Sequence, residues 1–230
     1  MDWRHPDAWK CMTDEGARAR FTKYIEDLNT ELFTNYGKID ILWYDMPWPR
    51  MSSKDWDSVN RNYKIRGLQP DILINNRSRM PEDFFTPEDA IVAEDGSDWE
   101  ACMTFNGISW GYVDEEQIAP YSYTANQIVR MLQRCSAAGG NLLLNIGPKA
   151  DGSVPREAVE PLHKVGAWLR ENGEAAYGLK KKISGEECGA NNVSKCPVSP
   201  DGKTVYVWNY IWPRTGEMVF GGYRKAPRRI

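Results

Sequence analysis

The sequence predicts an α/β fold with parallel strands. Three short apolar runs, at residues 39–44, 72–74 and 141–146, have the length of buried strands and are bounded by Gly, Pro or polar residues. Segments with helical spacing alternate with them, and this alternation is typical of a parallel sheet covered by helices. From 179 to 230 Gly and Asn become frequent, and we expect a β-rich segment too short to close a sandwich alone.

The helices are predicted from apolar periodicity and from the residues that start and stop them. Phe21, Tyr24 and Ile25 begin an apolar stripe, Pro155 suits a first helical turn, and Gly173 suits a C-terminal cap. The expected helices span residues 17–35, 53–66, 124–138 and 155–172. Weaker strand patterns are expected at 90–93, 204–210 and 217–220.

Composition excludes several function classes. The net charge of −3 gives no electrostatic reason to expect nucleic acid or an acidic membrane as a partner. His5 and His163 are far apart and no C-x-x-C occurs, so a zinc site is not expected. If the chain is exported to an oxidising compartment, Cys188 and Cys196 can form a disulfide, and the sequence alone does not decide this. No apolar leader or membrane-length run is present, so we expect the chain to stay where it is made.

Polar groups follow two of the predicted strands. Asp45 ends the first run, and Asn75-Asn76-Arg77 end the second. Because the carboxyl ends of parallel strands open onto the active site in α/β folds, Asp45 is a candidate for chemistry. A carboxylate that only caps the next element is the equally weighted alternative.

Residues 78–123 are rich in Pro, Gly, Asp and aromatics, and so long an irregular stretch usually carries function. It contains the acids Glu88 and Glu100. Two carboxyl groups about 5–5.5 Å apart are what retaining glycoside hydrolysis needs. The ten Trp and eleven Tyr residues suit a sugar-binding surface, although a large core is the more common cause of such abundance.

Residues 107–111 match the G-x-S-x-G pattern of serine hydrolases. That chemistry needs a strand before the serine, a helix after it and a late histidine. The residues before Ser109 make a poor strand and those after it a poor helix start, so we interpret the match as chance.

Six blocks together closely resemble the α-L-fucosidases of glycoside hydrolase family 29, over roughly residues 1–220. They are YGKIDILWYD at 36–45, NNR at 75–77, DFFTPE at 83–88, WEACMTFNGISWGY at 99–112, GNLLLNIGPKADG at 140–152 and WLRENGEAAYG at 168–178.

The resemblance implies a role for each candidate residue. Asp45 falls on the nucleophile of the family, and Glu88 on the acid/base, with Glu100 as its rival. Arg77 falls on the arginine that contacts fucose, although Asn76 stands where the family has Asp. Trp43 and Trp110 would form the walls of the sugar pocket. The implied partner is a fucosylated glycan, with no metal or cofactor.

The resemblance also implies a partial (β/α)₈-like barrel, with a catalytic domain at 1–178 and a truncated β-sandwich segment at 179–230. Family members have a longer N-terminal half that supplies the first barrel strands and histidines that hold the fucose. Two interpretations follow. The chain is a retaining fucosidase, with a homo-oligomer as one way to complete the barrel, or it is an inactive remnant that folds and binds glycans weakly.

Overall fold

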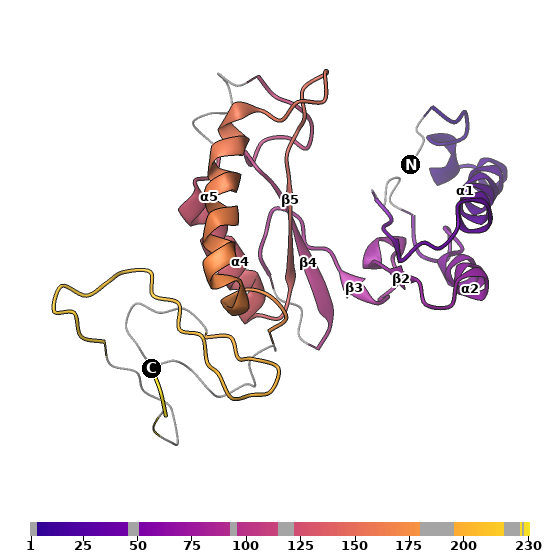
Figure 1. The fold of residues 1–230 in the computed structure, drawn as a ribbon. Coiled ribbons are helices and arrows are strands. Elements are labelled where there is room, and N and C mark those ends of the chain that lie inside the picture. Colours follow the sequence, from indigo (N-terminus) through magenta and orange to yellow (C-terminus); the bar gives the residue numbers. More distant parts are fainter. Residues whose placement is uncertain are drawn as a thin grey trace. The chain divides into compact units, whose positions relative to one another are not determined.

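The computed structural model describes residues 4–45, 51–92, 96–114, 122–179, 196–218, 226 and 228–230. The chain forms two compact units, Met1–Thr86 with Gly96–Asp98, and Pro87–Asp95 with Trp99–Ile230. Both contain helices, as Figure 1 shows. Each also contains a pair of parallel strands, so the α/β class is confirmed.

The first unit begins with a short helix, η1 (Lys10–Met12), and the long helix α1 (Glu15–Asn35). The Asp14 carboxylate accepts a hydrogen bond of 2.7 Å from the Ala17 backbone N–H. This cap explains why α1 starts two residues before the predicted 17–35. Phe21 and Phe33 are buried, whereas Leu28 and Leu32, expected on the same apolar stripe, are exposed.

Helix α2 (Ser58–Leu68) is shorter than the predicted 53–66 at its start. The reason is a turn before it, in which Ser52 Oγ donates to the Asp55 carboxylate at 2.8 Å and accepts from the Asp55 backbone N–H at 3.1 Å. Asp57 then adopts a φ of 51° immediately before the helix. This left-handed residue separates the serine turn from the helix.

Strands β1 (Ile41–Leu42) and β2 (Leu73–Ile74) pair in parallel, with Ile41 opposite Leu73. They are much shorter than the apolar runs that predicted them. The helix η2 (Asn76–Ser78) and the strand β3 (Phe84–Phe85) follow β2. The hydrophobic core around β1 and β2 consists of Phe33, Leu42, Ile65, Ile72 and Ile74.

The second unit is built on β4 (Asp98–Thr104) and β5 (Asn141–Asn145), which pair in parallel with Cys102 opposite Leu143. Helices α4 (Ala125–Ala137) and α5 (Arg156–Asn172) lie beside these strands in Figure 1. The predictions 124–138, 141–146 and 155–172 are confirmed to within about two residues. The helix η3 (Gly173–Ala175) follows α5.

Two local features fix the start of α4 and of β5. Thr124 and Gln127 form a reciprocal capping box at the start of α4. Gly140 precedes β5 because a Cβ atom there would lie 2.2 Å from the Trp99 ring, which is itself fully buried. A larger residue at 140 would therefore displace the largest side chain of β4.

Strand β4 was not predicted, and the expectation of an irregular stretch there is wrong. Its sequence is DWEACMT, and five of these seven residues, drawn from both faces of the strand, are buried. The sequence therefore shows neither the alternation of a half-buried strand nor the aliphatic run of a fully buried one. The strand expected at 90–93 is absent at 90–92, and residue 93 lies outside the described residues.

The β-rich segment contains less regular structure than predicted. Among the described residues of 204–210, Val205 forms a single antiparallel bridge with Val198. Residues 217 and 218 form no strand, and 219–220 lie outside the described residues. The domain boundary near residue 178 stays a prediction.

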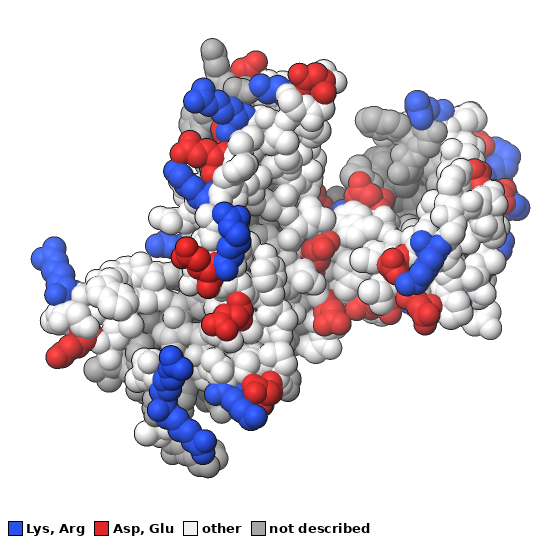
Figure 2. All heavy atoms as spheres, viewed as in Figure 1, with Lys and Arg blue, Asp and Glu red and all other residues white. Residues whose placement is uncertain are grey.

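Charged side chains of both signs are interspersed on the face shown in Figure 2. Among the described residues, no helix is long and apolar enough to cross a membrane. Cys196 is disulfide-bonded, while Cys11, Cys102 and Cys135 are free. Cys188, the partner suggested for Cys196, lies outside the described residues.

Candidate active site

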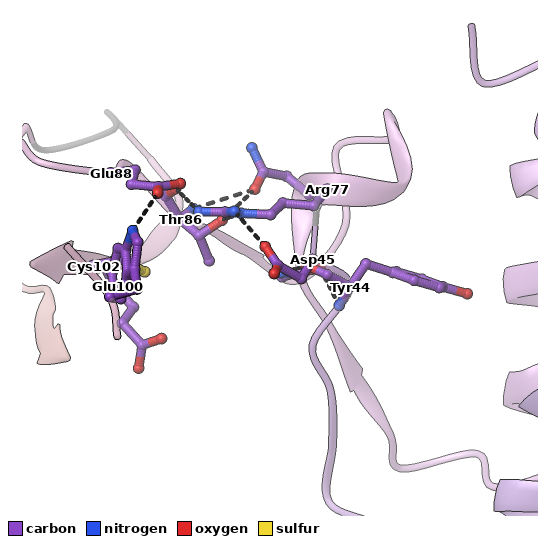
Figure 3. Close-up of polar contacts among 10 residues, drawn as sticks. Tyr44, Asp45, Arg77, Thr86, Glu88, Glu100 and Cys102 are labelled. Carbon is purple, nitrogen blue, oxygen red and sulfur yellow. Dashed lines mark hydrogen bonds and ion pairs between the residues drawn. The ribbon is translucent and has the colours of Figure 1, made fainter. Parts of the chain in front are cut away.

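In the first unit, Asp45 and Arg77 form an ion pair at the ends of the two short strands. Asp45 follows β1, and Arg77 lies in η2, directly after β2. Arg77 Nη1 donates to Asp45 Oδ1 at 3.0 Å, as Figure 3 shows. The Asp45 side chain is 62 % exposed and that of Arg77 only 12 %. Arg77 therefore orients the Asp45 carboxylate, and most of the surface of that side chain is exposed.

Other contacts in the first unit fix the guanidinium of Arg77. Its Nε donates to Thr86 Oγ1 at 2.9 Å, and its Cζ atom lies 4.5 Å from the centre of the Trp43 ring. The Asn76 side-chain oxygen in turn accepts from the backbone N–H and the hydroxyl of Thr86, both at 3.2 Å. Asn76 therefore serves to place Thr86, which places Arg77.

Asn75 acts as scaffold and does not face outward as a strand-end polar group would. It is fully buried, and its amide donates to the Tyr44 carbonyl at 2.8 Å and accepts from the Tyr44 backbone N–H at 3.0 Å. The backbone immediately before Asp45 is thereby tied to β2. Burial raises the pKa of Tyr44 to about 12, and its hydroxyl donates to Asn62 at 3.1 Å.

In the second unit, Glu88 and Trp110 are in direct contact. The Trp110 Nε1–H donates to Glu88 Oε1 at 3.0 Å. The Trp110 carbonyl accepts from Asn145 Nδ2 at 2.7 Å, so the end of β5 holds the tryptophan loop. Gly147 lets that loop approach, because a Cβ atom there would lie 2.3 Å from the Gly111 carbonyl oxygen.

Strand register places Glu88 and Glu100 on the same face of β4. Glu88 forms a parallel bridge with Cys102, and bridge partners point to the same side of a sheet. Glu100 is two residues from Cys102 and shares its face. Leu144, opposite Met103, packs against the α4–α5 core on the other face. Both acids therefore project from the side that the helices do not cover.

The structure gives each sequence candidate a local setting. Trp43, Asp45 and Arg77 form one cluster in the first unit, and Glu88 and Trp110 form another in the second, with Glu100 on the same strand face as Glu88. The serine hydrolase pattern does not fit. Although β4 precedes Ser109, residues up to Asp114 form no helix after it, and the Ser109 hydroxyl accepts from the Gly111 N–H at 3.2 Å.

The contacts of Trp110 and Asn75 were missed by sequence reasoning. In sequence, a tryptophan that hydrogen-bonds to an acid cannot be told from one that lines a sugar pocket. The position of Glu88 beside Cys102 depends on the register of β4, which the sequence did not reveal. The described residues contain no cluster of three or more His, Cys, Asp or Glu side chains that could bind a metal ion.

Comparison with known proteins assigns the family. The family model described as Alpha-L-fucosidase matches residues 1–174. The chain is 38 % identical to human plasma alpha-L-fucosidase over 128 residues, 56 % of this chain and 27 % of that protein. It is 28 % identical to the alpha-L-fucosidase of Branchiostoma floridae over 99 % of this chain and 52 % of the relative.

Solved structures agree with this assignment. Alpha-L-fucosidase isoenzyme 1 from Paenibacillus thiaminolyticus is 32 % identical with a TM-score of 0.65, covering 90 % of this chain and 59 % of its own. A trapped covalent intermediate of a family GH29 alpha-L-fucosidase from Bacteroides thetaiotaomicron has a TM-score of 0.76 at 23 % identity, covering 94 % of this chain and 54 % of its own, and so shares the fold.

The chain spans about half the length of the relatives that it matches over nearly all its residues. The matched region includes all six candidate residues, from Trp43 to Trp110. The chain therefore belongs to the alpha-L-fucosidase family.

Proposed function

We propose that the chain carries the catalytic carboxylates of a retaining α-L-fucosidase, which hydrolyses terminal α-L-fucosyl linkages of glycoconjugates. The observation that carries the proposal is the pair Asp45–Arg77, in which a largely exposed carboxylate accepts a hydrogen bond of 3.0 Å from the guanidinium, in a chain of this family. The fucosidase from Bacteroides thetaiotaomicron was solved as a trapped covalent intermediate, which supports the retaining mechanism.

Asp45 would attack the anomeric carbon of fucose. As the C1–oxygen bond to the leaving group breaks, Glu88 gives its proton to the departing oxygen and a fucosyl–aspartyl ester forms. Glu88 then takes a proton from water, which attacks the same carbon and releases Asp45 and fucose. Glu100 is the second candidate for the acid/base, since it shares the strand face of Glu88.

The neighbouring residues suit a deoxy sugar. Trp43 and Trp110 present aromatic surface that can pack against the C6 methyl group and the apolar ring face of fucose. The guanidinium of Arg77, a strong donor to oxygen, can hydrogen-bond to a ring hydroxyl of the sugar.

The finer architecture belongs to the same proposal. The catalytic domain at 1–178 would form part of a (β/α)₈-like barrel, and 179–230 part of a β-sandwich. The similarity in fold to solved fucosidases, at a TM-score of 0.78 over 94 % of this chain, supports this interpretation. A homo-oligomer or a further part of the protein would complete the barrel around the strand ends.

Release of nitrophenol from an aryl α-L-fucoside tests the function. We expect turnover by the chain and none by Asp45→Gly. Asp40→Gly is the matched control, because Asp40 lies on the same segment and pairs with the exposed Lys38 at the surface. Turnover that survives Asp45→Gly would refute the role of Asp45. A folded chain without any turnover would support the alternative, an inactive remnant.

A further inference from the structure

The second unit contains a pocket of about 460 Å³ formed by helices α4 and α5 and residues 205–210. Figure 1 shows the two helices and the orange-to-yellow segment that contributes those residues. The volume falls in the range of about 300–1,000 Å³ that is usual for small-molecule sites. None of the six residues proposed for catalysis or fucose contact lines it.

Aromatic side chains of the pocket are held in place by contacts within the protein. The rings of Trp168 and Trp208 pack at 4.9 Å between centroids. The hydroxyl of Tyr210 donates to the fully buried Gln133, and the Arg130 guanidinium lies 4.8 Å from the centre of its ring. Rigid aromatic rings offer flat apolar surface to the face of a pyranose without an ordering cost on binding.

Two residues of the pocket lining, Trp208 and Asn209, carry buried polar atoms without hydrogen-bond partners among the described residues. Both side-chain polar atoms of Asn209 and the indole nitrogen of Trp208 are buried, and no hydrogen bond satisfies them among the described residues. Burial of unpaired polar groups is unfavourable, and such groups are rare in native proteins. No hydrogen bond among the described residues holds the Asn209 amide, so a rotation of this side chain would let it bond to a ligand hydroxyl, which both donates and accepts.

The charge of the pocket narrows the ligand class. Arg130 is the one charged residue in the lining that the structure describes, so the pocket suits a neutral or anionic ligand. We propose that this pocket is a second carbohydrate site, which binds one pyranose of a glycan at a place separate from the catalytic carboxylates. The proposal does not depend on turnover at Asp45.

The test is a titration of the whole 230-residue chain with L-fucose, D-galactose and N-acetylneuraminic acid, followed by the indole N–H signals in NMR. Trp168→Phe and Trp208→Phe assign the two reporter signals. We expect at least one sugar to shift them saturably. Asn209→Leu, which removes the unpaired amide at similar volume, should weaken binding at least tenfold without lowering the unfolding temperature.

Arg77→Leu is the matched control, because it disables fucose contact at the proposed catalytic site and should leave the shifts of Trp168 and Trp208 unchanged. The proposal is overturned if no sugar shifts these signals, or if Arg77→Leu abolishes the shifts while Asn209→Leu retains them. A lower unfolding temperature for Asn209→Leu, with unaltered binding, would also overturn it, since the amide would then have a structural role only.

Discussion

The two carboxylate clusters differ in the group that holds each acid. Asp45 is paired with the cation Arg77, whereas the partner identified for Glu88 in the second unit is the neutral indole N–H of Trp110. Arg77 orients the Asp45 carboxylate through a charge-assisted hydrogen bond, whereas the Trp110 indole orients Glu88 through a neutral donor. The two acids are therefore oriented by different kinds of contact, and each contact can be removed by a single substitution without touching the other.

The largest effect is expected from removal of the nucleophile. Asp45→Gly should lower turnover by roughly 10³-fold or more, because no ester intermediate can form. Azide should restore part of the rate by attacking from the vacated side, and the product should then be the β-fucosyl azide, identified by NMR. Azide rescue of Glu88→Gly with this same product would reverse the roles assigned to the two clusters.

The next largest effect should separate Glu88 from Glu100. Glu88→Gln should slow hydrolysis of a methyl fucoside by about 10²–10⁴-fold, the usual contribution of a general acid. An aryl fucoside with a dinitrophenol leaving group needs no protonation, so its first step should be spared. Glu100→Gln, at the same strand face, should change both rates by less than about tenfold. The opposite ranking would move the acid/base to Glu100.

Arg77 should contribute through position as well as charge. Arg77→Leu should reduce kcat/KM by about 10²-fold, since a misoriented nucleophile loses the geometry of attack. Arg77→Lys keeps the charge but not the planar fork, and should recover only part of that loss. Recovery of the full rate by lysine would show that charge alone matters. Steady-state kinetics of the three proteins provide the measurement.

A smaller effect is expected for the neutral partner. Trp110→Phe keeps the aromatic wall and deletes the N–H bonded to Glu88, which should lower kcat about tenfold, the value of one hydrogen bond. KM should change little because the ring remains. The exposed Trp9 provides the control, Trp9→Phe. An effect on KM alone would make Trp110 a sugar contact without a role in positioning Glu88.

The last prediction concerns the phenol of Tyr44, the residue before Asp45. The pKa of Tyr44 is raised by burial to about 12, above its value near 10 in an unfolded chain. Tyr44 therefore stabilises the fold fully below about pH 10, and this contribution should be lost as the pH rises to about 12, by up to about 2 kcal/mol. Urea unfolding at about pH 10 and about pH 12 measures the free energy of unfolding, which should decline less for Tyr44→Phe than for the unchanged chain. An equal decline in both proteins would refute the raised pKa of Tyr44.

Sequence reasoning located the first cluster better than the second. Asp45 and Arg77 stand at the ends of apolar runs, and parallel pairing of those runs brings strand ends together, so their contact follows from pattern and topology. Glu88 and Trp110 are 22 residues apart in a stretch without periodicity, and their contact depends on the unpredicted strand β4. Small and sulfur-containing residues such as Ala101 and Cys102 fill that strand and leave no apolar signature.

The part played by Asn75 shows a different limit. An amide after a strand reads as a functional polar group, yet Asn75 is fully buried and satisfies the Tyr44 backbone. Only the tertiary structure shows whether such an amide faces a ligand or the main chain, because both uses need the same donor and acceptor.

The central claim is that Asp45 is the nucleophile, and covalent trapping tests it most directly. The chain is incubated with 2-fluoro-fucosyl fluoride, which forms the ester but hydrolyses it slowly, and the labelled peptide is sequenced by mass spectrometry. The account predicts one fucosyl label, on Asp45, that is lost in Asp45→Gly and retained in Asp40→Gly. A label on Glu88, Glu100 or any other residue, or no label on the folded chain, would contradict it.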